Sequence, residues 1–233
     1  MIISTLNIDW AKTKATKVKI EEALLKSASD IIVVTESVQS LNLPGYDYVY
    51  HTKIIPDEVL YEGVDYSTML KGNKAVRVSI FSKYEAIKTY TVTDEYTSIC
   101  KAFETPKGTL TIYGTIIGTQ FTKKPYAENE LNNCIADCLR IRSETNTLCL
   151  IGDLNTSFLE SEKDFEMKGI HSRLALRDLC KTCAFDLSTA GIDENIDHIF
   201  VPKKLREYFT IMEKVFVKKN VLSDHKGVSI EIN

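Results

Sequence analysis

Two stacked β-sheets with helices on their outer faces, an α/β fold, form the architecture that this sequence predicts. Apolar runs of strand length recur along the chain, and each half also contains a stretch with helical periodicity. The chain has 233 residues, of which 44% are hydrophobic, and this is enough for a sizeable core. No internal repeat, low-complexity tract or flexible linker interrupts it. We therefore expect a single domain over residues 1–233.

The first part of the chain alternates strand, helix and strand. A strand is expected from Ile2 to Ile8, an amphipathic helix from about Lys14 to Ser27, and a second apolar strand from Asp30 to Glu36. The helix places most of its apolar side chains on one face, and these are Val18, Ile20, Leu24 and Leu25. Each of the two strands ends at or beside a carboxylate or an amide.

The middle of the chain has the pattern of β-hairpins. Short β-rich segments follow one another between Tyr46 and Ile117, separated by turns such as Pro106-Lys107-Gly108. The strands expected in this region cover residues 75–81, 86–92, 98–103 and 109–117. Sequential pairing of such strands favours an antiparallel sheet.

The second half begins and ends with recognisable elements. Helices are expected from Ala127 to about Ser143 and from Arg173 to Cys183, on either side of an apolar strand that starts at Leu148. Three further strand-like segments close the chain, at residues 196–201, 211–217 and 227–232.

The segment from Leu148 to Asn155 is the most informative stretch of the chain. Four apolar residues run into Gly152, which permits a sharp turn, and then into Asp153 and Asn155. Because side chains alternate along a strand, Asp153 and Asn155 leave its end pointing the same way. A carboxylate beside an amide is a suitable pair for positioning a water molecule and holding an anionic oxygen. Gly-Asp-x-Asn also suits a plain turn, and the motif alone does not separate the two interpretations.

Polar side chains gather at the ends of other predicted strands as well. They are Asn7 and Asp9, Glu36, Asp197 and His198, and Asp224 and His225. Singly, each would be a solvated surface group, but Asp and Glu beside core strands are rarely buried without partners. Carboxylate oxygens on a rigid frame suit magnesium, and a histidine with a carboxylate partner can donate a proton to a phosphate.

Composition limits the class of protein. The chain carries 29 Lys and Arg against 32 Asp and Glu, a formal net charge of −3, so no global basic field attracts a polyanion. No leader-like segment opens the chain, and no apolar run approaches the roughly 18 residues that would span a bilayer. We expect a soluble, cytoplasmic monomer without a membrane span.

The six cysteines do not change this expectation. Cys180 and Cys183 have the spacing of a metal-binding pair, but no second pair accompanies them and they fall in a predicted helix. We therefore interpret the cysteines as small buried hydrophobic residues and not as zinc ligands.

Five short motifs resemble those of one superfamily. They are Thr5-Leu6-Asn7-Ile8-Asp9, Val34-Thr35-Glu36, Gly152-Asp153-Leu154-Asn155, Ile196-Asp197-His198-Ile199-Phe200 and Leu222-Ser223-Asp224-His225. Each is weak alone, but all five occur in order, each on the expected kind of element. Together they resemble the endonuclease/exonuclease/phosphatase superfamily, which includes DNase I, exonuclease III, abasic-site endonucleases, sphingomyelinases and inositol polyphosphate 5-phosphatases.

The resemblance implies a four-layer, DNase I-like α/β sandwich of two mostly antiparallel sheets flanked by helices. It also implies a hydrolase that cleaves phosphoester bonds with the help of Mg²⁺ (or Mn²⁺). Glu36 would be the principal metal ligand, with Asp9 and Asp224 contributing directly or through water.

The same resemblance assigns catalytic roles. Asp153 would orient and deprotonate the attacking water, while Asn155 and Asn7 would donate hydrogen bonds around the scissile phosphate. Asp197 would hold His225 in the tautomer that contacts this phosphate. The metal and the donors would offset the negative charge that develops during an in-line displacement.

Two positions receive separate interpretations. His198 stands where the family tolerates Tyr or His, and we expect it to pack in the core. Ile116 stands where family members usually have a His or Tyr that donates to the phosphate. One interpretation is that a donor is missing, in which case Ile116→His would raise kcat and Thr115 or Gln120 are the available substitutes. The competing interpretation is that Ile116 is a buried strand residue and that the true counterpart lies elsewhere.

The predicted activity is that of a nuclease, a phosphodiesterase acting on DNA or RNA as endonuclease or exonuclease. Two alternatives stay open: a phosphatase or phosphodiesterase acting on a small or lipid phosphate, and a weakened nucleic-acid-binding member. The loops at residues 52–73 and 156–170 are the expected specificity elements. The second loop is acidic, which does not favour a long duplex across it. Asp193-Glu194-Asn195-Ile196 lacks the aromatic-Arg pattern of abasic-site endonucleases, which argues against that role.

Overall fold

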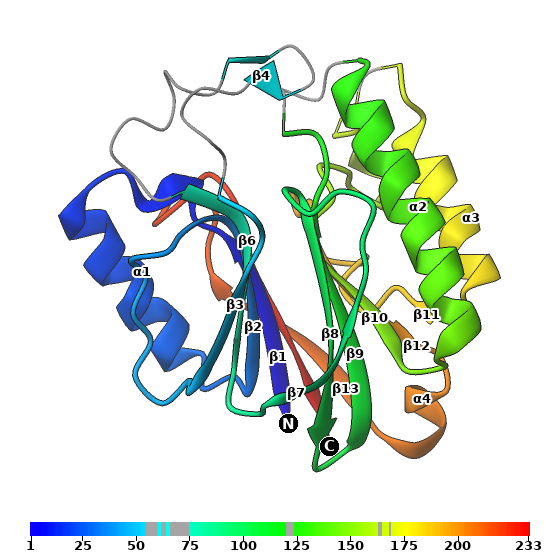
Figure 1. Ribbon diagram of the computed structural model, residues 1–233, viewed down its shortest axis with the longest axis horizontal. Helices are drawn as coiled ribbons and strands as arrows, with labels where there is room; N and C mark the ends of the chain where they lie inside the picture. Colours follow the sequence, from blue (N-terminus) through cyan, green and yellow to red (C-terminus); the bar gives the residue numbers. More distant parts are fainter. Residues whose placement is uncertain (55–59, 62–63, 66–74, 120–123, 163–164, 168) are drawn as a thin grey trace.

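The computed structural model describes residues 1–54, 60–61, 64–65, 75–119, 124–162, 165–167 and 169–233. Two sheets of six strands each stack face to face, and helices cover both outer faces (Figure 1). The layers are therefore helix, sheet, sheet and helix. The predicted four-layer α/β sandwich is confirmed.

The first sheet combines the two ends of the chain with its first third. Its strands are β1 (Ile2–Asn7), β2 (Ile31–Val38), β3 (Tyr48–His51), β6 (Ala75–Ser82), β13 (Ile211–Val217) and β14 (Gly227–Ile232). Their order across the sheet is β13-β14-β1-β2-β6-β3. β1 and β2 are parallel, and every other pair is antiparallel. The carboxyl ends of β1 and β2 consequently lie together.

The second sheet is built from the middle of the chain and one late segment. Its strands are β7 (Ala86–Tyr90), β8 (Ser98–Thr105), β9 (Gly108–Ile116), β10 (Leu148–Asp153), β11 (Phe185–Asp186) and β12 (Asp197–Pro202). They lie in the order β11-β12-β10-β9-β8-β7, and β9 and β10 are parallel. Antiparallel pairing aligns Asp153, at the end of β10, with Asp197, at the start of β12.

The helices separate cleanly between the two faces. α1 (Lys14–Lys26), whose first turn is capped by the Thr13 hydroxyl, covers the first sheet, and α2 (Tyr126–Glu144) and α3 (Ser172–Thr182) cover the second. The short elements are 3-10 turns η1 (Asp9–Ala11) and η2 (Glu160–Glu162), α4 (Leu205–Tyr208), and the hairpin β4 (Leu60–Tyr61) with β5 (Val64–Asp65). No helix within the described residues has the length and apolarity to cross a bilayer.

Three hydrophobic clusters separate these layers. One joins α1 to the first sheet, one lies between the sheets, and one joins the second sheet to α2 and α3. Gly114 lets the sheets approach closely, because a Cβ added there would lie 3.2 Å from a Val78 methyl and 3.3 Å from a Val33 methyl. All six cysteines are unpaired and buried in two of these clusters, as predicted.

The predicted elements are confirmed with small shifts at their ends. On α1, however, only Ile20 and Leu24 are buried, whereas Val18 and Leu25 are exposed by 45% and 38%. Ile20 and Leu24 are four residues apart and share the buried face of α1, whereas Val18 and Leu25 lie beside that face. Strands β3 and β11 and helix α4 were not expected, because two to four residues are too few to show a period.

Candidate active site

Side chains from both sheets converge on one pocket of about 580 Å³. Asp9, Glu36, Asp153, Asn155, Asp224 and His225 line it, together with Trp10, Lys12, Gly118 and Thr119. Asn7 and Asp197 are almost completely buried directly behind this lining. The fold therefore brings together all eight predicted site residues, which lie on segments as far apart as β1 and the turn before β14.

Asp153 is held by hydrogen bonds to both of its carboxylate oxygens. The Asn7 amide donates to Oδ2 over 2.9 Å, and the backbone N–H of Asn155 donates to Oδ1, also over 2.9 Å. Burial raises the pKa of the Asp153 carboxyl, while His225 and these hydrogen bonds oppose the rise. A fixed carboxylate with a raised pKa is suited to accept a proton.

Gly152 is required where β10 delivers Asp153. Its φ of +140° lies in the region that favours glycine, and an added Cβ would come within 1.9 Å of the Thr115 carbonyl oxygen. Gly152 and Asp153 are still paired with β9 and β12 at this point. The motif is therefore the end of a buried strand, and the plain-turn interpretation is wrong.

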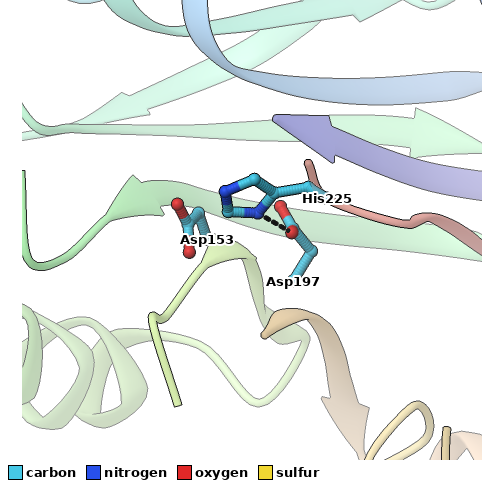
Figure 2. A group of neighbouring side chains, drawn as sticks. All are labelled: Asp153, Asp197 and His225. Carbon is cyan, nitrogen blue, oxygen red and sulfur yellow. Dashed lines mark hydrogen bonds and ion pairs between the residues drawn. The ribbon is translucent and has the colours of Figure 1, made fainter. Parts of the chain in front are cut away.

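Asp197 and His225 form a second fixed pair. The Nδ1–H of His225 donates to Asp197 Oδ2 over 2.6 Å, and Figure 2 shows the imidazole ring between Asp197 and Asp153. Burial by itself would lower the pKa of His225, but the carboxylates of Asp197 and Asp153 outweigh it and raise this pKa to about 10. The imidazole is consequently protonated at neutral pH, and its Nε2–H is available to an anionic oxygen.

Three carboxylates form the other wall of the pocket. Burial raises the pKa of Glu36 to about 7, and the neighbouring carboxylates of Asp9 and Asp224 add to the rise. Asp9 contacts Lys12 Nζ at 2.6 Å, and the Asp224 side chain is 73% exposed. A half-buried carboxylate beside two others is a site that a divalent cation would stabilise, so this donor set fits Mg²⁺ or Mn²⁺.

Asp153, Asp197 and His225 also lie close enough together to hold a metal ion, since their ligand atoms are within 4.8 Å of one another. The 2.6 Å contact already occupies Nδ1 of His225 and Oδ2 of Asp197, and the Asn7 amide and the Asn155 backbone N–H donate to the two oxygens of Asp153. The Glu36 side of the pocket is therefore the better cation site.

Backbone strain is concentrated around this pocket. In the described part of the chain, ten residues other than glycine have positive φ, and four of them line the pocket. These are Asp9 (45°), Trp10 (60°), Glu36 (46°) and Asn155 (46°). Each left-handed residue costs about 1–2 kcal/mol, and strain of this kind is typical of functional sites.

Several residues at the site were not anticipated. Glu130 of α2 is buried, and its carboxylate accepts hydrogen bonds from Gly118 N at 2.6 Å, from Thr119 N at 3.0 Å and from the Thr119 hydroxyl. Glu130 therefore fixes the segment that follows β9. The side-chain amide of Asn155 donates to the Ile117 carbonyl of this segment over 2.7 Å. A glutamate on an amphipathic helix gives no signal of such a role, because the same pattern describes a solvated face.

Ile116 is a core residue. Its side chain is 1% exposed, lies in the cluster between the sheets and does not line the pocket. The interpretation as a missing donor is therefore wrong, because residues alternate along β9 and this one faces the opposite sheet. Thr115 is buried as well, with its hydroxyl beside Ser98 at 2.8 Å, and Gln120 lies outside the described residues.

His198 packs in the core as predicted. It is fully buried, with Nε2 donating to the Thr156 carbonyl over 2.9 Å and Nδ1 accepting from the Thr189 hydroxyl over 3.2 Å. Burial lowers its pKa to about 4, so the ring is neutral.

The described acids of the acidic loop make contacts within the protein. Glu160 pairs with Arg177 at 2.8 Å, Glu162 accepts hydrogen bonds from the Ser157 hydroxyl and from Glu194 N, and Glu166 accepts from Arg173 N. Asp164 and most of the loop at 52–73 lie outside the described residues. The described acids therefore help to hold the loop in place.

No family model matches the chain, and no curated protein is similar to it in sequence. Among solved structures, the endonuclease domain of TRAS1, a telomere-specific non-LTR retrotransposon, has a TM-score of 0.68 and 14% identity over 100% of this chain and 97% of its own. A 3′-5′ exonuclease from Neisseria meningitidis has a TM-score of 0.68 and 14% identity, covering 100% of both chains. An AP endonuclease from Archaeoglobus fulgidus has the same TM-score and identity, with coverage of 100% and 99%.

These similarities define the class of fold. The chain adopts the DNase I-like fold of the endonuclease/exonuclease/phosphatase superfamily, as its five motifs predicted. At 14% identity the comparisons concern the fold alone, and function has to be argued from the site.

Proposed function

We propose that residues 1–233 form a single endonuclease/exonuclease/phosphatase domain that hydrolyses phosphodiester bonds in nucleic acid with the help of a divalent metal ion. The observation that carries this proposal is the pair of contacts Asn7–Asp153 and Asp197–His225 beside the three carboxylates of one pocket. A proton acceptor, a cationic donor and a cation site are the groups that attack of water on a phosphodiester requires.

Each residue has a defined task in this mechanism. Asp153 orients a water molecule and accepts its proton, while Asn7 and the Asn155 backbone N–H keep the carboxylate in position. His225 donates from Nε2 to a phosphate oxygen, and Asp197 fixes the orientation of the ring. A divalent cation held by Glu36, with Asp9 and Asp224, would supply positive charge against the phosphate.

Nucleic acid is the substrate class that we favour. The structures similar in fold are titled as an endonuclease, a 3′-5′ exonuclease, AP endonucleases and a 3′ phosphatase bound to a product DNA hairpin. A beta toxin from Staphylococcus aureus has a similar fold as well, so fold alone does not select the substrate.

A substrate panel with and without metal tests the proposal. The panel consists of single-stranded, duplex and abasic DNA, RNA, cyclic dinucleotides and phosphoinositides, each offered with Mg²⁺, with Mn²⁺ and with EDTA. We expect cleavage of at least one nucleic acid that stops with EDTA and returns with metal. Activity that is indifferent to chelation would refute the metal assignment.

Asp153→Asn separates catalysis from binding. It removes the proton acceptor but keeps the shape of the side chain, so we expect kcat to fall by about 10²–10⁴-fold with little change in binding. Asp178→Asn is the matched control, because Asp178 lies on the surface of α3 with 60% of its side chain exposed. If the wild-type protein binds members of the panel and cleaves none, the protein is a noncatalytic binding module.

A further inference from the structure

Trp10 occupies an unusual place in this molecule. It follows β1 directly, lines the active-site pocket beside Asp9 and Lys12, and is half-buried. Its neighbours Ile8 and Ala11 pack into the cluster beneath α1, but Trp10 packs against none of the three hydrophobic clusters. Within the described part of the chain, no aromatic ring or cation stacks on the indole. The side chain is therefore not explained by core packing.

The backbone at Trp10 makes its presence costly. Asp9, Trp10 and Ala11 have φ values of 45°, 60° and 46°, which is a left-handed turn. Two hydrogen bonds close it: Ala11 N to the Ile8 carbonyl, 2.9 Å, and Asp9 N to Asn7 Oδ1, 2.9 Å. Glycine is the residue that adopts this conformation without steric cost. A large aromatic side chain kept in such a turn at a pocket points to a role in that pocket.

We propose that Trp10 stacks on an unpaired nucleobase adjacent to the phosphate that the pocket holds. This inference rests on the proposed function and narrows it to substrates with an unstacked base, such as single strands or frayed ends. Aromatic stacking accepts every base because each has a planar π-face, whereas a base inside a duplex has both faces covered.

The charge of the pocket does not by itself attract a nucleic acid. Asp9, Glu36 and Asp224 line the same pocket as Trp10, and without a bound cation these carboxylates oppose any anionic ligand, a phosphate backbone included. The whole chain carries a formal net charge of −3, so affinity for a nucleic acid cannot come from a general positive field. Stacking is an uncharged attraction, so it supplies affinity that such a protein otherwise lacks.

Trp10 is the only tryptophan in the sequence, so its fluorescence reports on this position alone. The wild-type protein is titrated in EDTA with a single-stranded oligodeoxynucleotide of eight residues and with a strand of equal length and charge built from abasic spacers. We expect the base-bearing strand to quench the indole emission and to bind about 5- to 150-fold more tightly, the range of one stacked base. Equal affinities with unchanged emission would overturn the inference.

Variants test the same point independently of the fluorescence. With a dye-labelled strand, we expect Trp10→Ala and Trp10→Gly to weaken binding of the base-bearing strand equally and Trp10→Phe to weaken it less. We also expect Trp10→Gly to melt a few degrees above Trp10→Ala, because only glycine relieves the left-handed backbone. Tyr208→Ala is the control, since Tyr208 is an aromatic residue of α4 outside the pocket and 67% exposed. If the Trp10 variants bind the base-bearing strand as the wild type does, Trp10 does not stack.

The two proposals fail in different ways. If the abasic strand is cleaved in Mg²⁺ as efficiently as the base-bearing strand, the phosphodiesterase stands and the stacking role falls. If the base-bearing strand quenches the indole but no phosphodiester is cleaved, the stacking role stands and the protein binds without catalysis.

Discussion

The charge state of His225 depends on its carboxylate neighbours, and Asp197 is the one that it contacts directly. Asp197 is completely buried, one of its oxygens receives the His225 N–H, and the other has no hydrogen-bond partner among the described residues. Burial lowers the pKa of an imidazole, and it is the nearby carboxylates that raise it to about 10 here. These carboxylates, Asp197 foremost, therefore keep the proposed phosphate donor protonated at neutral pH.

Asp197→Asn should move the alkaline limb of the pH–activity profile. In the wild-type protein we expect activity to fall as the pH rises through about 10, where His225 would release its proton. In the variant we expect this limb near or below about pH 6.5, with activity at pH 7.5 reduced about 10–100-fold. Asp193→Asn is the control, because Asp193 is an exposed residue of the same segment that pairs with Lys226. An unmoved limb would mean that Asp197 does not set the charge of His225.

Ile116→His should lower stability without improving turnover. The new imidazole would lie in the apolar layer between the sheets, and an unpaired buried polar group costs about 1–3 kcal/mol. Thermal melting and kcat of the two proteins measure both effects. Ile116→Val, a loss of about 0.5–1.5 kcal/mol, is the volume control. A gain in kcat would restore the interpretation of Ile116 as a missing donor.

The site residues at strand ends could be predicted from the sequence, but Trp10, which stands out by its backbone conformation, could not. Asp153 was recognisable because it follows an apolar run, and His225 because it stands in a family-like motif just before the last predicted strand. Trp10 was not recognisable, since what distinguishes it is a positive φ and its place outside the hydrophobic clusters, and neither shows in the sequence. Ile116 was considered as a site position from the family resemblance, and only its place on β9, in the layer between the sheets, shows which way it faces.

At the scale of elements, β10 does most to place the site. Parallel pairing with β9 and antiparallel pairing with β12 fix its register, so Asp153 lies beside both Ile116 and Asp197. Its four-residue apolar run made this strand predictable. The segment after β9 was not predictable, because it is held by a side chain from α2, and such long-range contacts leave no local pattern.

Gly152→Ala should break this arrangement. The added methyl group would meet the Thr115 carbonyl at 1.9 Å, so β9 and β10 must separate. We expect a loss of about 1–3 kcal/mol from overpacking and a similar amount from the backbone conformation, together with reduced kcat. Gly191→Ala is the control, because nothing lies within 4 Å of its added Cβ. Equal unfolding free energies for the two variants would show that β10 tolerates the side chain.

For the whole molecule, the important feature is that the site is divided between the two sheets. Asn7 and Glu36 belong to the first sheet, and Asp153 and Asp197 belong to the second. The contacts Asn7–Asp153 and His225–Asp197 join the two halves. The distance between the sheets therefore determines the geometry of the site, and Gly114 is where they approach closely.

Gly114→Val should reduce activity more than its effect on stability explains. The larger side chain would push against Val78 and Val33 of the first sheet and part the two halves of the site. Overpacking costs about 1–3 kcal/mol, and we expect a clear loss of kcat at temperatures where the variant is still folded. Ala127→Val overpacks the layer between the second sheet and α2, so it should cost stability but spare kcat. Equal kcat values for the two variants would contradict this account.

The position of β14 affects the order in which the strands of the first sheet can pair while the chain is being synthesised. Residues 227–232 lie between β13 and β1, and Met1 N contacts the Ile232 carbonyl at 3.0 Å (Figure 1). The first sheet is therefore incomplete until the ribosome has released residues 227–232, and until then one edge of β1 is unpaired. An unpaired strand edge is prone to aggregation. His225 lies just before β14, so its contact with Asp197 depends on the pairing of this strand.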